Sequence, residues 1–130
     1  MNQTTSENKQ LIADYLSTLS GRAKTPDLAA RFVSDPLLIG HIQEVEAAFP
    51  AYELIPQEIL AERDLVVVRG VFRGIHRGAF AGISATGKSV SAGMMIMYRI
   101  ADGRIADHWL QFDLFGLLGQ LKEAPVTTAA

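Results

Sequence analysis

The sequence predicts an α+β fold in which helices come first and an antiparallel sheet follows. Up to Phe49, apolar residues recur at the spacing of helices. From Glu53 to Phe112, runs of apolar and β-branched residues alternate with short turn sequences. Helices and strands are therefore segregated along the chain, which favours a meander over parallel βαβ winding.

The first helix is indicated by one apolar stripe, after which Gly21 provides a left-handed stop. Thr5 or Ser6 is the expected N-cap. The stripe consists of Leu11, Ile12, Tyr15, Leu16 and Leu19.

Two further helices are expected to begin at Thr25-Pro26 and Asp35-Pro36. Each pair combines an N-cap side chain with a proline at the first helical position. The third helix should run to Phe49, where Pro50 ends it. Its apolar stripe contains His41 among Leu38, Ile42, Val45 and Phe49.

The strands are expected at residues 53–61, 65–76, 89–100 and 104–112, with a short helix at 114–121. Pro56 predicts an edge position or a bulge for the first strand. Residues 77–88 are rich in Gly, Ala, Ser and Thr and predict a loop. Asp113 is the expected N-cap of the last helix.

Length and composition limit the class of protein. With 130 residues, 48% of them apolar, the chain is expected to form a single domain over 1–130, with frayed ends at 1–5 and 125–130. It has no cysteine and a formal net charge of -2, which argues against disulfides, thiolate metal sites and nucleic-acid binding. Residues 1–8 lack the apolar core of a signal peptide, so a cytoplasmic protein is expected.

Two strand segments, 65–68 and 94–97, are apolar at every position, which indicates cover on both faces of the sheet. Helices can cover one face, and a second copy of the chain is the simplest cover for the other. The expected homodimer face carries Met95, Met97 and Trp109, although Trp109 could also be ordinary core.

The turn after Ile100 sets which side chains face inward. A three-residue loop, 101–103, would place Ile100 opposite Arg104, and is preferred to a two-residue loop, which would shift the pairing by one. The inner row would then contain Met94, Ile96, Tyr98, Ala106, His108 and Leu110.

Residues 82–89 match the GxxxxGK(S/T) pattern of a phosphate-binding loop. A strand rather than a helix is expected to follow, so a plain loop between strands is the preferred interpretation. The three histidines lack the local spacing of a zinc site, so no metal is expected.

Several polar residues have both a structural and a chemical interpretation. His41 and His108 are either satisfied core residues or acid/base groups of a pocket. Tyr15 is either core or a hydroxyl that reaches a cavity, and Asp35 is first of all a helix cap. Asp107 is expected to be a solvated charge.

An ordered series of motifs resembles the SnoaL-like polyketide (ester) cyclases over residues 7–122. The motifs are AFP at 48–50, GIHRGAF at 74–80, GISATGK at 82–88, DGRIADHW at 102–109 and LLGQL at 117–121. The resemblance implies the cone of the nuclear transport factor 2-like superfamily, in which helices close a strongly curved antiparallel sheet over one deep pocket. It also implies dimers formed through the outer face of the sheet.

The characterised cyclases of this family carry out an intramolecular aldol condensation without metal or cofactor, using an aspartate as acid/base. By the resemblance, the position of this aspartate falls on Leu110, two residues after a family histidine that matches His108. The polar positions of the preceding strand fall on Met94 and Ile96.

The remaining positions that the resemblance carries over supply polar groups. A third-helix position of the family falls on His41, and an aromatic position of the first helix falls on Tyr15. The family's Asn or His before the third helix matches Asp35 only loosely, because this chain is shorter there.

The expected site therefore combines catalytic candidates with apolar binding residues. His108, His41 and Asp35 are the catalytic candidates, and the ligand-binding candidates are Tyr15, Met94, Ile96, Tyr98 and Leu110. The expected ligand is a flat, largely apolar carbonyl compound, and the expected chemistry is cyclisation, isomerisation or dehydration by proton transfer, with no cofactor. Leu110 in place of a carboxylate keeps a non-catalytic binding or interaction module open, and nucleotide binding rests only on the loop pattern.

Overall fold

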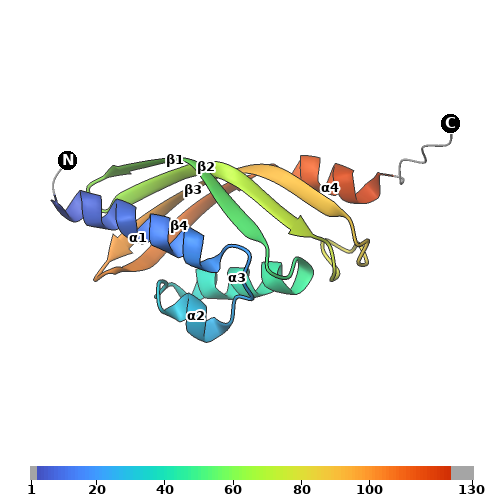
Figure 1. The fold of residues 1–130 in the computed structure, drawn as a ribbon, viewed down its shortest axis with the longest axis horizontal. Coiled ribbons are helices and arrows are strands. Elements are labelled where there is room, and N and C mark those ends of the chain that lie inside the picture. The colour runs from blue at the N-terminus through green and yellow to red at the C-terminus, as the bar shows by residue number, and fades with distance from the viewer. Residues whose placement is uncertain (1–2, 124–130) are drawn as a thin grey trace.

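A curved antiparallel sheet with helices on its concave side makes up the computed structural model, which describes residues 3–123 (Figure 1). The strands pair in the order β1-β2-β3-β4 as an antiparallel meander. The α+β prediction is confirmed. The elements are α1 (Gln3–Leu19), α2 (Pro26–Ala30), α3 (Pro36–Ala48), β1 (Glu53–Glu62), β2 (Leu65–Ile75), β3 (Ser89–Ala101), β4 (Arg104–Phe112) and α4 (Leu114–Lys122).

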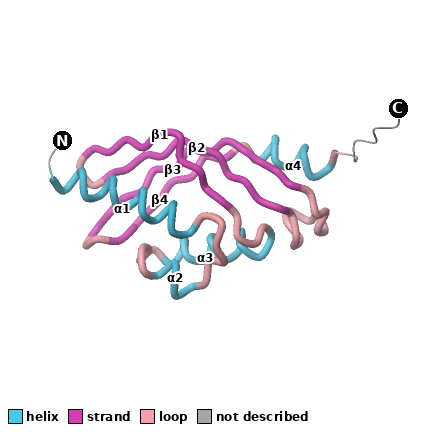
Figure 2. Tube along the Cα trace, viewed as in Figure 1, coloured by secondary structure: helices cyan, strands magenta, loops and turns pink. Residues whose placement is uncertain are grey.

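The helices α1, α2 and α3 all lie on the concave side of the arched sheet, and α4 follows β4 and lies beside β3 (Figure 2). Gln120 of α4 binds the free edge of β3 where β4 has ended. Its side chain donates to the carbonyl of Ser91 at 2.7 Å and accepts from the Ser91 amide at 3.0 Å. None of the helices within residues 3–123 is long and apolar enough to span a membrane.

The expected caps of the later helices are present. Thr25 Oγ1 accepts from the Leu28 amide at 3.2 Å, Asp35 Oδ1 from that of Leu37 at 3.0 Å, and Asp113 Oδ1 from that of Gly116 at 3.0 Å. Each cap satisfies an amide that the first turn of a helix leaves without a partner.

The expectation for the N-terminus is wrong, because α1 already begins at Gln3. Thr5 and Ser6 therefore lie within the helix rather than at its cap. Gly21 has a φ of 71°, as expected for the left-handed residue that follows a helix. The expected fraying at 125–130 lies outside the described residues.

The β3–β4 turn differs from the expected three-residue loop. Only Asp102 and Gly103 form it, with φ values of 52° and 72°, so that Ala101 pairs with Arg104. Positive φ at both central residues is the type I′ geometry that matches the twist of a hairpin.

A bulge then restores the predicted faces. Ala106 has no partner between the pairs Ile100–Ile105 and Arg99–Asp107, so it is an extra residue in β4. Beyond it, the pairs are Tyr98–His108, Ile96–Leu110 and Met94–Phe112. The partners are displaced by two residues from those expected, and because side chains alternate with a period of two, the same side chains still face inward.

The outer face of the sheet carries large exposed apolar side chains in the single chain. Met95 is 50% exposed, Met97 37% and Trp109 46%, whereas Met94 and Ile96 on the inner face are buried. Trp109 is therefore not a core residue of the chain. Residues 3–123 cover only one face of the sheet, and cover of the other face by a second copy remains a prediction.

The phosphate-loop pattern lies between β2 and β3, with a strand on each side, so the plain-loop interpretation is confirmed. Buried His76 closes this loop, since its Nδ1 accepts from the Thr86 amide at 3.1 Å. Lys88 donates instead to the last carbonyls of α4, at 3.1 Å for Leu121 and 3.4 Å for Gln120. Its ammonium therefore has a structural role.

Pro56 has the expected effect on β1. This strand is at an edge of the sheet, and its pairing with β2 shifts between Pro56 and Glu58. Proline cannot donate to a strand ladder, so an edge strand with a bulge tolerates it.

Candidate active site

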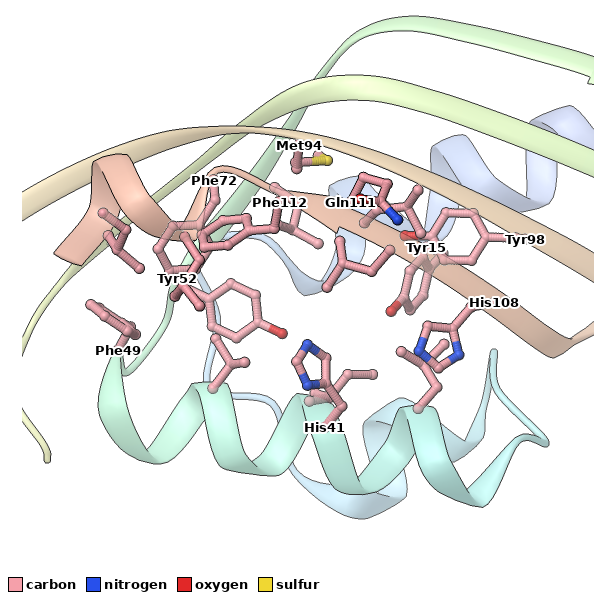
Figure 3. Close-up of a pocket in the computed structure, with 18 of the residues that line it drawn as sticks. Tyr15, His41, Phe49, Tyr52, Phe72, Met94, Tyr98, His108, Gln111 and Phe112 are labelled. Atoms are coloured by element: carbon pink, nitrogen blue, oxygen red, sulfur yellow. The ribbon is translucent and has the colours of Figure 1, made fainter. Parts of the chain in front are cut away.

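A cavity of about 420 Å³ lies between α3 and the concave face of the sheet (Figure 3). This volume is typical of small-molecule sites. Its wall is mostly apolar, and its polar side chains belong to Tyr15, Tyr52, Tyr98, His41, His108 and Gln111. The arrangement suits a ligand with an apolar body and few polar atoms.

The two periodicities of the chain build this wall. Leu38, His41, Ile42 and Val45 recur at helical spacing and present one face of α3. Alternating side chains of β3 and β4 form the opposite wall: Met94, Ile96, Tyr98, His108, Leu110 and Phe112.

Asp35 and His108 form a hydrogen-bonded pair, with 3.0 Å between Asp35 Oδ2 and His108 Nδ1. Both side chains are largely buried, at 10% and 18% exposure. The other carboxylate oxygen of Asp35 caps α3 through the Leu37 amide. One carboxylate therefore fixes both the start of the helix and the imidazole on the neighbouring strand.

The backbone places Asp35 beside β4. Val33 forms a parallel bridge with Ile105, and the amides of Ser34 and Asp35 both donate to the Ile105 carbonyl, at 2.9 and 3.3 Å. Ile105 immediately precedes the bulged residue of β4. The bulge and the helix cap thus meet at the same point and bring the two side chains together.

The hydrogen bond with Asp35 determines which ring nitrogen of His108 is available to a ligand. A carboxylate only accepts hydrogen bonds, so Nδ1 carries the proton that is donated to Asp35. Nε2 then bears the free lone pair, and it has no hydrogen-bond partner among residues 3–123. The side chain lines the cavity, where this nitrogen can accept a proton.

His41 faces the same cavity from α3. Burial lowers the pKa of His41 below its usual value, and the neighbouring His108 lowers it further, while Glu44 acts in the opposite direction. The imidazole is therefore neutral at pH 7, so it can donate or accept a hydrogen bond without introducing a charge.

Two tyrosine hydroxyls also point into the cavity. Figure 3 shows the hydroxyls of Tyr15 and Tyr52 directed into the space that the two imidazoles face. Burial raises the pKa of both phenols, so both remain protonated near neutral pH. Tyr15 is held by edge contacts with the rings of Phe32 and Tyr98, at centroid distances of 5.7 and 5.8 Å.

Every candidate named from the sequence lies in or beside the cavity. His41, His108, Tyr15, Met94, Ile96, Tyr98 and Leu110 line it. Asp35 does not line it, but contacts His108.

The aromatic part of the wall was not predicted from the sequence. It consists of Phe49, Tyr52, Phe72, Phe80 and Phe112. Phe72 could have been found, because it continues the alternation of buried residues along β2. Tyr52 carries no such signal, because it lies between a helix and a strand.

One group of side chains could in principle hold a metal ion. Asp35, Asp107 and His108 each place a ligand atom within 4.8 Å of the others. Both oxygens of Asp35 already accept hydrogen bonds, and exposed Asp107 accepts from the backbone amide of His108 at 2.8 Å. The donors therefore fit a hydrogen-bonded pair better than a metal centre.

Solved structures share this architecture. AclR, a proposed hydroxylase from Streptomyces galilaeus, is 23% identical with a TM-score of 0.78, over 96% of this chain and 87% of its own. TsrD from Streptomyces laurentii is 24% identical with a TM-score of 0.75, over 94% of this chain and 98% of TsrD. A SnoaL-like polyketide cyclase from Agrobacterium tumefaciens is 16% identical with a TM-score of 0.72, over 88% of this chain and 97% of that protein. None of the curated proteins matches the chain.

These likenesses show the fold, the α+β cone expected from the motifs, and their names cover more than one activity. The family is shown by the sequence itself. The family model for SnoaL-like polyketide cyclases matches residues 21–121, which include all the strands and the lining residues of α3. The chain belongs to the SnoaL-like polyketide cyclase family.

Proposed function

We propose that this protein binds a flat, largely apolar carbonyl compound in the cavity and transfers protons to and from it, with His108 as the acid/base group. The observation that carries the proposal is the 3.0 Å contact between Asp35 and Nδ1 of His108, which leaves Nε2 free in an apolar cavity. An imidazole can both accept and donate a proton, so its chemistry suits a group that takes a proton from the ligand and returns it.

The other side chains divide into orienting and holding groups. Asp35 fixes the tautomer of His108 and stabilises the imidazolium that forms. His41 and Tyr15 orient the carbonyl oxygen of the ligand. The apolar body of the ligand packs against Met94, Ile96, Tyr98 and Leu110.

The proposed step begins with a carbon–hydrogen bond next to the carbonyl group. Its proton passes to Nε2 of His108, and its electron pair moves into an enolate. In a cyclisation, the enolate carbon attacks a second carbonyl of the same molecule, and His108 returns its proton to the new alkoxide. In an isomerisation, the proton returns to a different carbon, and in a dehydration it leaves with hydroxide as water.

A non-catalytic binding module is the alternative, and Leu110 favours it. The family resemblance places the acid/base aspartate of the characterised cyclases at this position, and leucine cannot transfer protons. The protein would then use the same cavity to hold its ligand without turnover.

Hydrogen–deuterium exchange at the carbons next to the carbonyl of 2-tetralone tests the proposal. This flat bicyclic ketone reports proton abstraction by NMR in D2O without knowledge of the natural substrate. We expect the protein to accelerate exchange, and the H108Q variant to lose about 10²- to 10⁴-fold of the rate. The matched variant H41Q should lose about tenfold or less, because His41 orients the ketone and does not take the proton.

The outcomes separate the two candidate functions. Equal exchange rates with wild-type protein and H108Q would overturn the acid/base role. If NMR shifts showed 2-tetralone bound but not exchanging, the binding-module alternative would be supported. If 2-tetralone did not bind at all, the ligand class would be wrong.

We further propose that the outer face of the sheet forms a homodimer through Met95, Met97 and Trp109. These large apolar side chains are adjacent, because Met97 pairs directly with Trp109, and they are exposed in the single chain. Methionine and tryptophan are enriched in protein interfaces. Light scattering should give the mass of two chains for the wild type and of one chain for W109K, and a wild-type monomer would refute the interface.

A further inference from the structure

We infer that Tyr52, backed by the buried ammonium group of Lys24, is the hydrogen-bond donor for an oxygen atom of the ligand. The inference deepens the proposed function, on which it rests for the presence of a ligand in the cavity. It adds a further polar contact beside those proposed for His41 and Tyr15, separate from the acid/base role of His108.

Lys24 is a buried cation behind the cavity wall, with only 3% of its surface exposed. Its ammonium donates to the carbonyls of Tyr52 at 2.7 Å and Arg22 at 2.9 Å, and to Glu46 Oε1 at 3.4 Å. These acceptors match the three donors of a protonated amine, which has no acceptor of its own. Burial lowers the pKa of Lys24, but Glu46 opposes this effect.

The same ammonium lies over the Tyr52 ring, 3.9 Å from the ring centroid. A cation at this distance is attracted to the face of the ring. Its positive charge stabilises negative charge that develops at the phenol oxygen, while Glu46, which pairs with the same ammonium, raises the pKa of Tyr52 and acts in the opposite direction. Lys24 thus acts on the ligand through Tyr52 and is a positioning residue.

Both the backbone and the ring of Tyr52 are held in place. Its carbonyl accepts from Lys24 and from the amide of Gly21 at 3.2 Å, and its ring packs on Phe72 at a centroid distance of 5.5 Å. A donor that is already held in place does not need to be ordered when the ligand binds.

The hydroxyl of Tyr52 has no hydrogen-bond partner among the described residues, although the residue is only 4% exposed. The protein does not enclose this hydroxyl, because Tyr52 lines the cavity, so it is free to donate to a molecule there. Figure 3 shows this hydroxyl pointing into the cavity, toward the space next to His41. A ligand oxygen in that space would supply the missing acceptor.

The donor chemistry defines the class of ligand oxygen. Burial raises the pKa of Tyr52, so the phenol donates and does not carry charge. Its partner is a carbonyl, enolate or phenolate oxygen, and the cation behind the ring favours an oxygen that is negative. In the proposed proton transfer, the carbonyl oxygen becomes negative as carbon loses its proton, so this contact strengthens along the reaction.

Naphthalene and 2-naphthol form a matched pair of probes that differ in a single oxygen. We expect the wild type to bind 2-naphthol more tightly than naphthalene. The Y52F variant should lose about 3- to 10-fold of its affinity for 2-naphthol, as expected for one neutral hydrogen bond, and should bind naphthalene within about twofold of the wild type.

A second measurement tests Lys24. The absorbance of bound 4-nitrophenol reports its ionisation, and the wild type should favour the phenolate more than K24M does. A purely structural lysine would change stability without moving this equilibrium. If K24M does not fold, the absorbance of 4-nitrophenol bound to Y52F replaces it, with the same expected loss of phenolate.

The results distinguish this inference from the proposed function. Equal losses for both naphthalene probes in Y52F, or no loss for either, would overturn the role of Tyr52 while leaving the cavity and His108 unaffected. Unchanged ionisation of 4-nitrophenol in the folded variant would overturn the role of Lys24. Failure of both naphthalene and 2-naphthol to bind the wild type would overturn the proposed function itself.

Discussion

Asp35 makes two hydrogen bonds that substitutions can separate. Its Oδ1 caps α3 through the Leu37 amide, and its Oδ2 accepts from His108. Asparagine keeps one oxygen for the cap but presents an NH2 group to His108, so Nδ1 must become the acceptor and the ring proton must move to Nε2. Alanine removes both bonds.

The expected stabilities follow from these contacts. Loss of an aspartate cap costs about 1 kcal/mol, and loss of a hydrogen bond to a charged group about 1.5–3 kcal/mol. D35A should therefore be destabilised by about 3 kcal/mol. D35N retains a good cap and a neutral hydrogen bond, so it should lose about 1 kcal/mol or less.

Three measurements on the two variants test this reasoning. Urea unfolding gives the free energies, and ¹⁵N NMR of His108 identifies the protonated ring nitrogen. Exchange of 2-tetralone gives the catalytic consequence. D35N should fold almost as stably as the wild type, hold the Nε2–H tautomer, and lose exchange to the extent that H108Q does, because the nitrogen in the cavity no longer has a free lone pair.

Two results would refute this account. Equal destabilisation of D35N and D35A would show that the cap does not survive as argued. An unchanged His108 tautomer in D35N, or full exchange despite a switched tautomer, would show that Asp35 does not control the acid/base nitrogen.

Three other regions give separate predictions. The pKa of His41 is lower in the folded chain than in the unfolded chain, where it has its ordinary value of ~6.5. As pH falls through ~6.5, the unfolded chain therefore binds the proton first, and the free energy of unfolding should fall. NMR titration should show the pKa of His41 rising in H108Q, and no change would contradict the coupling. A methyl group at Gly78 would overlap the backbone of α3, so G78A should lower the free energy of unfolding, measured by thermal unfolding, by about 1–3 kcal/mol. In G93A the new methyl group meets open space, so the loss should be about 1 kcal/mol or less. The free energy of unfolding of K88M should be about 1 kcal/mol lower, because the carbonyls at the end of α4 lose the ammonium group of Lys88. ATP should not change the melting temperature of the wild type, and stabilisation by ATP would restore the phosphate-loop interpretation.

The boundaries of several elements are predictable because their signals are local. Thr25-Pro26 and Asp35-Pro36 each supply a cap and a proline, and both helices begin there. Gly21 likewise marks a backbone conformation that glycine adopts without strain. Such signals depend on a few neighbouring residues and need no knowledge of the tertiary structure.

The register of the last hairpin shows where local reasoning fails. A two-residue turn alone would have exchanged the faces of His108 and Trp109, and the bulge at Ala106 reverses that exchange. Neither feature is visible in the alternation of apolar residues. The inward face was predicted correctly because two departures, each of one residue, add to a shift of two.

The pairing of Asp35 with His108 was beyond the residue patterns for a different reason. The two residues are 73 positions apart, and a bridge between Val33 and β4 brings them together. An aspartate before a proline is fully explained as a cap, so nothing in the pattern requires a second partner. Its second role follows only from the tertiary structure.

The leucine at position 110 and the hydrogen-bonded pair of Asp35 and His108 are physically related. A carboxylate on the inner face of β4 would put an unpaired charge into an apolar cavity, which is costly unless the group is protonated or hydrogen-bonded. In this chain the carboxylate lies at the start of α3 instead, where the helix amide and the imidazole satisfy it. In the proposed site, the group left facing the ligand is then Nε2 of His108, and an apolar ligand can enter beside Leu110 without displacing the water of a carboxylate. Under the proposed function, leucine at position 110 therefore changes which residue carries the proton and does not remove the means of carrying it.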